Sequence, residues 1–214
     1  MKRKPTSRPA PSPATGLVLI GAGGHALVVA EAAEMAGFHV LGAYDDDTAA
    51  AAFRIMRIKN LGPLQSEIAK SAPFILALGD LKLRRRILNR PLPGSAARVL
   101  HPKAIAHTSA RIGAGVYIGP AAVVHTFAEI GPHAIINSGA IVEHECTVGE
   151  NSHIAPGAVL GGRVRIGPDT LIGLGARVLP NLTIGRGCTI GAGAVVVRDV
   201  PDRSTLKGVP AGRD

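Results

Sequence analysis

Residues 112–142 read IGAGVYIGPAAVVHTFAEIGPHAIINSGAIV, and in this stretch an apolar residue returns at every sixth position. The series runs without a gap from Leu100 to Val196, and sixteen of its seventeen members are Ile, Leu or Val. A second series, here called the small-residue rank, lies four residues after each member of this first rank. Its residues are small or β-branched everywhere except at Leu182. Glycine directly follows the first rank in nine cases. A period of six matches neither an amphipathic helix nor an alternating strand.

The repeat predicts a parallel β-helix built from hexapeptides. Each six residues make one short flat side and one turn, and three sides close a triangular coil of roughly 18 residues. Coils stack at about 4.8 Å, the distance between hydrogen-bonded strands. Because such a stack has open ends, we expect other parts of the chain to cover them.

Positive charge gathers at the start of the chain, which has 214 residues and a formal net charge of +9. Residues 1–15 carry four basic side chains and no acid, and we expect a disordered basic tail there. The tail lacks the apolar core of a signal peptide, and no stretch of the chain approaches a membrane span. With 3% aromatic residues and no nucleic-acid motif, phosphorylated small molecules explain the charge better than nucleic acid.

Both cysteines, Cys146 and Cys188, stand in the small-residue rank, seven six-residue sides apart. Seven is not a multiple of three, so we expect the two thiols on different faces of the prism, too far apart for a disulfide. Free thiols indicate a reducing compartment, and the expected location is cytoplasmic.

The segment before the repeat is predicted to form a Rossmann-like βαβ domain with a parallel sheet. The expected elements are strands at 17–20, 40–44 and 74–78 and helices at 26–36 and 82–89. The predicted division of the chain is a tail at 1–15, the Rossmann-like domain at 16–98, the β-helix at 99–200 and a C-terminal segment at 201–214.

Residues 21–25, GAGGH, follow the first predicted strand and open the first helix. Glycines at such a turn present backbone N–H groups that suit a phosphate, and the acids Asp45 and Asp46 after the next strand suit ribose or base hydroxyls. The spacing also matches a loose dinucleotide fingerprint, but the domain has about half the residues that a dinucleotide fold needs. We therefore favour a mononucleotide or nucleotide-sugar site, the alternative being glycines that only form a tight turn.

Histidines are concentrated on the repeat. His107, His125 and Glu143 follow one another at intervals of 18 residues, so they should form a column on one edge. Such a ladder does not supply tetrahedral geometry, and we expect no metal site. His144 lies between Glu143 and Glu145, and a His held by a carboxylate is typical of a general base. Which of the two glutamates orients the ring stays open at this point.

Several motifs together resemble the NeuD/PglD-type sugar acetyltransferases, whose fold is a left-handed β-helix. The motifs are GAGGHA at 21–26, YDDD at 44–47, LGD at 78–80, NSGAIVEHEC at 137–146, HIAPGAVLGG at 153–162 and GVPA at 208–211. The resemblance implies a homotrimer with acetyl-CoA, as co-substrate, in the groove between neighbouring prisms. It also implies a nucleotide-linked sugar in the front domain and no tightly bound cofactor.

The resemblance also implies roles for single residues. His144 matches the base, Glu145 its orienting acid, and Asn137 a polar residue of the same cleft. Residues implied for acetyl-CoA binding are His153, Gly162, Gly173 and Lys207. Residues implied for the nucleotide sugar are Gly23, Gly24, His25, Asp45, Asp46, Gly79 and Asp80. The chain departs from the family at Leu81, where Asn is common, and at Gly212–Arg213, where a Lys often follows GVPA.

Taken together, these features predict an acetyl-CoA-dependent N-acetyltransferase that acts on a nucleotide-linked amino sugar for bacterial glycan biosynthesis. One alternative is O-acetylation of a sialic-acid-like sugar by the same residues. A second, of a different class, is a non-catalytic nucleotide-binding scaffold, which an intact His144–Glu145 pair disfavours. The sequence does not decide which sugar or which nucleotide is bound.

Overall fold

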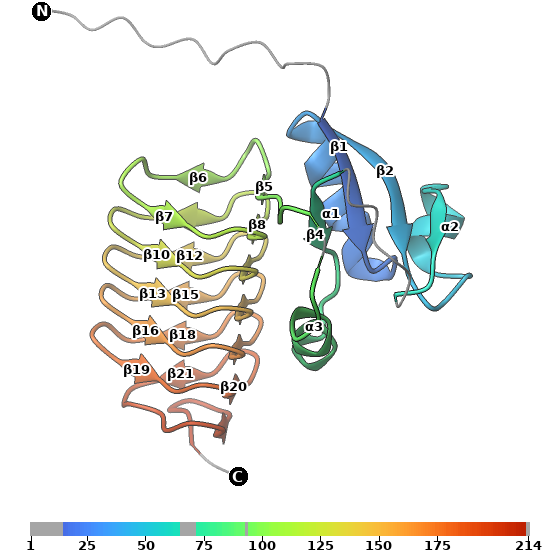
Figure 1. Cartoon of the computed structure of the whole chain (residues 1–214). Coiled ribbons are helices and arrows are strands. Elements are labelled where there is room, and N and C mark those ends of the chain that lie inside the picture. The colour runs from blue at the N-terminus through green and yellow to red at the C-terminus, as the bar shows by residue number, and fades with distance from the viewer. Residues whose placement is uncertain (1–14, 65–71, 93, 213–214) are drawn as a thin grey trace, which may run out of the picture.

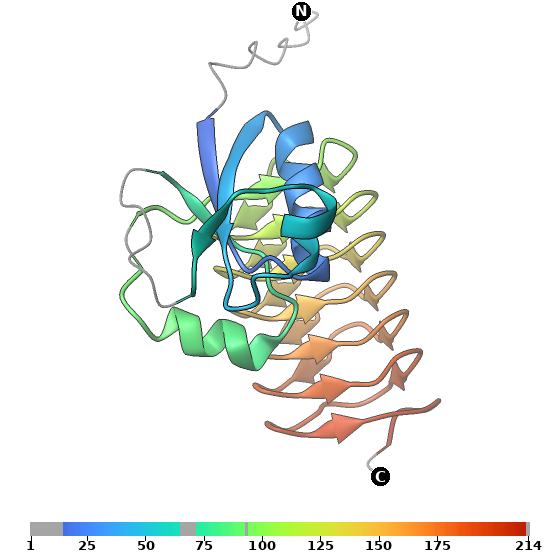
Figure 2. The same ribbon diagram turned by 90° about the vertical axis from the view of Figure 1, so that its right-hand side faces the viewer.

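The computed structural model describes residues 15–64, 72–92 and 94–212, in two parts that lie side by side (Figures 1 and 2). An α/β domain forms the first part, and a solenoid of short parallel strands forms the second. Residues 1–14 of the predicted tail lie outside the described residues, whereas Thr15 already belongs to the first strand.

The α/β domain contains a parallel sheet with the strand order β3-β2-β1-β4. Its elements are β1 Thr15–Ile20, α1 Gly24–Met35, β2 Phe38–Tyr44, α2 Ala51–Ile55, β3 Asn60–Gly62, β4 Phe74–Leu76 and α3 Leu81–Leu88. The predicted Rossmann-like topology is confirmed, although α2 and β3 were not predicted. Helix α1 begins two residues earlier than predicted because the extended Gly23 is its N-cap. Strand β4 ends at Leu76, two residues earlier than predicted.

The solenoid wraps three parallel sheets around one aliphatic core. The seven-stranded sheet holds β5 Val99–Leu100, β8 Tyr117–Ile118, β11 Ile135–Ile136, β14 His153–Ile154, β17 Leu171–Ile172, β20 Thr189–Ile190 and β22 Thr205–Leu206. The six-stranded sheet holds β6 Ile105–Ala106, β9 Val123–Val124, β12 Ile141–Val142, β15 Val159–Leu160, β18 Arg177–Val178 and β21 Val195–Val196. The five-stranded sheet holds β7 Arg111–Ile112, β10 Glu129–Ile130, β13 Thr147–Val148, β16 Arg165–Ile166 and β19 Thr183–Ile184.

Register in the solenoid follows the repeat. Ile136, for example, pairs with Ile118 on one side and with Ile154 on the other, one coil away in each direction. The second residue of each strand points into the core, and the first points outward. Cys146 and Cys188 are both buried and free, and each precedes a strand of a different sheet. The predicted left-handed β-helix of hexapeptides is therefore the fold of this half.

The α/β domain packs against the outer side of the first strands of the seven-stranded sheet. Buried alanines of α1 pack with the outward residues Val99, Tyr117 and Ile135 of that sheet. Helix α3 lies along the lower coils, as Figure 1 shows. Within the described ranges, no helix has both the length and the apolar character needed to cross a membrane.

Candidate active site

His144 and Glu145 stand in the turn after β12 and form a side-chain pair. His144 Nδ1 lies 2.9 Å from Glu145 Oε2, and Arg163 Nε donates to the same oxygen at 3.1 Å. The hydrogen bond from His144 and the positive charge of Arg163 lower the pKa of the Glu145 carboxyl. The ionised carboxylate therefore accepts the Nδ1 proton, which leaves the lone pair of Nε2 free to act as a base.

The other glutamate of the motif makes a different contact. Glu143 Oε2 accepts from the backbone N–H of His144 at 3.3 Å, whereas the bond to the ring comes from Glu145. The two neighbouring side chains thus diverge, and the ring is oriented by Glu145.

Gly162 borders the free side of the His144 ring. A Cβ added at Gly162 would lie 2.5 Å from His144 Nε2, closer than any van der Waals contact allows. Since Gly162 does not adopt a positive φ, the need for glycine here is one of space rather than of backbone conformation. The missing side chain keeps one flank of Nε2 open to a substrate.

A second group of predicted residues lies elsewhere on the solenoid. Asn137 Nδ2 is 3.1 Å from His153 Nε2, and Asn137 Oδ1 accepts from the backbone N–H of Ser138 at 2.8 Å. This second bond fixes the orientation of the amide, so Asn137 donates and His153 Nε2 accepts. His153 therefore carries its proton on Nδ1. Burial, with His25 and Arg84 nearby, lowers the pKa of His153 to about 4, so the ring is neutral at neutral pH.

His25 reaches from the first turn of α1 toward the same group. Its ring centroid is 6.3 Å from that of His153 and 5.5 Å from that of Tyr117, which it meets edge-on. Burial, aided by the charge of Arg84, lowers the pKa of His25 to about 4. The buried His25 Nε2 and Tyr117 hydroxyl find no hydrogen-bond partner among the described residues.

The predicted nucleotide-sugar residues line the edge of the front sheet where its strands end. Gly23 and Gly24 face open space, whereas Gly79 lies beside His25. Three carboxylates accept hydrogen bonds from backbone N–H groups of the loops here. Asp45 accepts from Ala22 at 2.6 Å and from Asp47 at 3.0 Å. Asp46 accepts from Leu64 at 3.0 Å, and Asp80 accepts from Leu83 at 2.7 Å. These carboxylates therefore shape the loops, and a ligand role for them stays a prediction.

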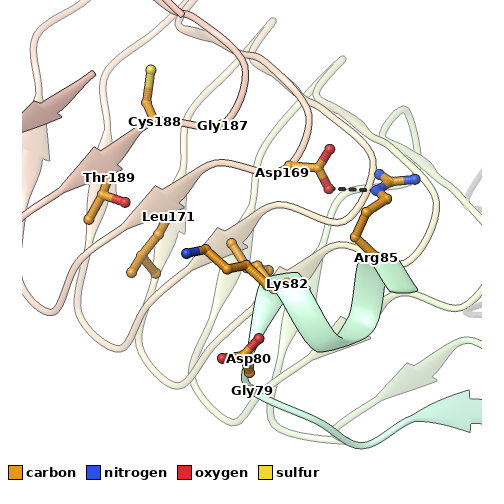
Figure 3. A pocket seen from close by; sticks show the side chains of 10 residues that line it. Gly79, Asp80, Lys82, Arg85, Asp169, Leu171, Gly187, Cys188 and Thr189 are labelled. Atoms are coloured by element: carbon orange, nitrogen blue, oxygen red, sulfur yellow. Dashed lines mark hydrogen bonds and ion pairs between the residues drawn. The ribbon is translucent and has the colours of Figure 1, made fainter. Parts of the chain in front are cut away.

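A cavity of about 660 Å³ opens between the start of α3 and the lower coils (Figure 3). Gly79, Asp80 and Lys82 line one side of it, and Leu171 and Thr189 line the other. Arg85 Nε lies 2.8 Å from Asp169 Oδ1 at its border. Gly79 and Asp80 were predicted site residues, whereas the other lining residues were not predicted, although the outward place of Leu171 and Thr189 follows from the repeat.

The predicted acetyl-CoA and catalytic residues lie on two different edges of the prism. Asn137, Gly173 and Lys207 each directly follow a strand of the seven-stranded sheet, so they share one edge. His144 and Gly162 each stand two residues after a strand of the six-stranded sheet, so they share the next edge. The width of the six-stranded sheet separates the two edges. A single chain therefore does not bring His144 together with Asn137 and His153.

Comparisons with known proteins place the chain in a family. The profile of the PglD N-terminal domain matches residues 16–90, and the bacterial transferase hexapeptide profile (six repeats) matches 109–144, 127–162 and 163–198. The acetyltransferase domain of PglB from Neisseria gonorrhoeae FA1090 is 34% identical, with a TM-score of 0.86, over 93% of this chain and 99% of that chain. The chain belongs to the NeuD/PglD-type sugar acetyltransferases.

Two further solved structures are similar to this chain. PerB from Caulobacter crescentus, solved in complex with CoA and GDP-perosamine, is 35% identical with a TM-score of 0.83, over 93% of this chain and 97% of that chain. WeeI from Acinetobacter baumannii AYE, 23% identical, has the same fold with a TM-score of 0.78. No match was found among curated protein sequences. The chain is thus an acyltransferase by family.

The predicted histidine column is present on this acyltransferase as a stacked pair. The rings of His107 and His125 lie 4.3 Å apart between centroids, at an angle of 22°. His107 Nδ1 contacts Thr126 Oγ1 at 3.2 Å, and His125 Nδ1 is buried. In the described part of the chain, no three His, Cys, Asp or Glu side chains are grouped as metal ligands.

Proposed function

We propose that this enzyme transfers the acetyl group of acetyl-CoA to the amino group of a nucleotide-linked amino sugar used in bacterial glycan biosynthesis. The observation that carries the proposal is the His144–Glu145–Arg163 arrangement, which presents a free imidazole nitrogen beside Gly162. The similarity to PerB, solved with CoA and GDP-perosamine, supports the choice of both substrates. The two free cysteines support a reducing compartment, the cytoplasm.

In the proposed reaction, the sugar amine attacks the carbonyl carbon of the thioester. His144 Nε2 takes a proton from the amine nitrogen as the C–N bond forms, and Glu145 stabilises the imidazolium that results. The tetrahedral intermediate then collapses with cleavage of the C–S bond. The CoA thiolate leaves and takes the proton back from His144, which restores the free base.

The oxyanion of the intermediate needs a hydrogen-bond donor. Gly161 N–H is already engaged by Val178 O at 2.9 Å. Gly162 N–H, in contrast, has no backbone acceptor within the described ranges. We therefore assign the backbone N–H of Gly162 as this donor.

The proposed site is completed by a second copy of the chain, in a homotrimer. His144 lies on one edge of the prism and Asn137 on the other, so the edge of one copy must meet the opposite edge of its neighbour. The outer face of the intervening six-stranded sheet supports this contact, because five of the six outward residues of its column are apolar: Ile105, Val123, Ile141, Val159 and Val195, with Arg177 as the exception. The matching column of the five-stranded sheet is polar at Arg111, Glu129, Thr147, Arg165 and Thr183.

The proposed activity is tested by the release of CoA thiol from acetyl-CoA in the presence of UDP-amino sugars, GDP-amino sugars or free sialic acids. We expect release with a nucleotide-linked amino sugar and an amide product in the mass spectrum. Release with hydroxyl acceptors only would establish O-acetylation instead. No release with any acceptor, despite binding of acetyl-CoA and of a nucleotide sugar, would point to the non-catalytic scaffold.

A further inference from the structure

Arg84 of α3 is a buried cation that has no carboxylate partner among the described residues. Its side chain is 1% exposed. The guanidinium donates to Leu76 O at 3.0 Å, to Leu78 O at 3.1 Å, to Asn151 Oδ1 at 2.9 Å and to His133 O. All four acceptors are carbonyl oxygens, two from the α/β domain and two from the solenoid.

On the side of the α/β domain, these bonds hold the loop that begins α3. Leu78 O is the carbonyl directly before Gly79 and Asp80, two residues of the predicted nucleotide-sugar site. On the other side of this loop, Asn151 Nδ2 donates to Leu81 O at 3.1 Å. The loop is therefore bonded directly to the solenoid at Leu81, through Asn151, and indirectly at Leu78, through Arg84.

On the side of the solenoid, Arg84 holds two successive turns. His133 and Asn151 both adopt a left-handed backbone, with φ of 56° and 55°, and each stands two residues before a strand. Those strands are β11 and β14, which are neighbours in the seven-stranded sheet. Strand β14 begins with His153, so the turn that Arg84 binds leads directly into the predicted acetyl contact.

The burial of Arg84 is not needed for attachment alone. Its neighbour Arg85 already binds α3 to the solenoid through Asp169 at 2.8 Å and Glu150 at 3.3 Å, close to the surface. Burying a charge costs free energy, and an apolar side chain of similar volume often stabilises a protein as well or better. An apolar side chain has no hydrogen-bond donors, whereas the planar guanidinium of arginine holds several acceptors in one fixed geometry.

We propose that Arg84 is a positioning residue that sets the distance between the Gly79–Asp80 loop, which binds the nucleotide sugar, and His153, which contacts the acetyl group. This inference rests on the proposed function. A displacement of the order of 1 Å between reacting groups lowers the rate by about 10²-fold. One rigid guanidinium shared by both sites would prevent such a displacement.

The charge of Arg84 also acts on the two buried imidazoles. The rings of His25 and His153 face each other, and the other titratable groups near them are Arg84 and Tyr117, with Glu31 beyond Tyr117. Burial is the largest cause that lowers the pKa of His25 and of His153, each to about 4. The positive charge of Arg84 is a further cause for both rings, and for His153 it comes after the effect of His25. Removal of this charge makes protonation easier, so both pKa values should rise.

The test compares Arg84→Met with Arg86→Met, an exposed arginine on the same helix. We expect Arg84→Met to lower kcat/KM for the nucleotide amino sugar by about 10- to 100-fold, while the Kd of CoA, measured by calorimetry, changes less than about twofold. In the NMR titration of the histidine rings, the His25 and His153 signals, identified with His25→Gln and His153→Gln, should titrate at higher pH than in the parent. Arg86→Met should match the parent in every measurement.

Parent-like kcat/KM, or unchanged histidine titrations, in a folded Arg84→Met would overturn the proposal. If Arg84→Met does not fold, Arg84→Lys decides. The lysine side chain fills the space of Arg84, but its single ammonium cannot bond all four carbonyl oxygens. A parent-like kcat/KM in Arg84→Lys would therefore contradict the proposal. The NMR arm needs no substrate. It therefore tests Arg84 even if thiol release shows that the proposed function is wrong.

Discussion

At the scale of single residues, the chemistry depends on what surrounds the two nitrogens of His144. Nδ1 is bonded to Glu145, whose pKa is lowered by the hydrogen bond from His144 and by the charge of Arg163, and Gly162 leaves space beside Nε2. The motif itself predicted a base with an orienting glutamate. The spacing of the residues left the choice between Glu143 and Glu145 open, because it depends on the left-handed turn at Glu145, where φ is 58°, and only the family resemblance implied Glu145.

Gly162→Ala should lower turnover while leaving the melting temperature nearly unchanged. The added methyl would lie 2.5 Å from His144 Nε2, and the tip of the ring can swing away at little cost in stability. The displaced ring then loses its alignment with the substrate. Steady-state thiol release and thermal unfolding measure the two effects. A parent-like turnover would show that the space beside Nε2 is not used.

Arg163→Met should raise the pH at which the Glu145 carboxylate takes up a proton, measured by an NMR titration of that carboxyl. The hydrogen bond from His144 and the charge of Arg163 both lower the pKa of Glu145, so removing the cation raises it and the carboxylate is lost at a higher pH. The shift should shrink in high salt because the pair is exposed. Arg165→Met, an exposed outward arginine of β16, serves as control and should leave the titration in place.

At the scale of elements, the repeat predicted nearly every strand of the solenoid, because each strand places one aliphatic residue in the core. The front domain was harder to predict. Helix α2, with five residues, and β3, with three, are too short to show a period. The basic helix α3 was expected, but the sequence does not distinguish the buried Arg84 from the exposed Arg86, because that difference arises from contact with the solenoid.

Gly23→Val tests the turn between β1 and α1. Nothing lies within 4 Å of a Cβ at Gly23 and its φ is −70°, so the variant should fold. The added side chain should block a diphosphate and weaken nucleotide-sugar binding, while acetyl-CoA, bound on the solenoid, should keep its affinity. Calorimetry with each ligand separately measures both. Equal loss of both ligands, or tight NAD binding by the parent, would contradict this site.

At the scale of the whole molecule, the predicted site residues lie on two edges of the prism, with an apolar sheet between them. The interval of 36 residues between Asn137 and Gly173 already indicates a shared edge, since it equals two coils. The sequence also places His144 and His153 half a coil apart. The polarity of the outward residues on each face follows from the same interval of 18 residues, whereas the packing of α1 on Val99, Tyr117 and Ile135 of the seven-stranded sheet was not predicted.

Ile141→Glu should break the proposed trimer into smaller species and lower activity with it. The substitution places a charge in the centre of the apolar face, where it would be buried between copies without a partner. Thr147→Glu, at the equivalent outward place of the five-stranded sheet, should leave the assembly intact. Light scattering gives the mass of each variant. A monomeric parent with full activity would exclude a site shared between chains.

The turnover of His144→Ala at saturating concentrations of both substrates decides whether His144 is the base for acetyl transfer to a nucleotide-linked amino sugar. We expect a loss of roughly 10²–10⁴, the usual contribution of a general base, with acetyl-CoA binding retained. Glu145→Gln should cost less, since it disturbs only the orientation and basicity of the ring. A loss of less than about tenfold in His144→Ala would show that another group removes the proton.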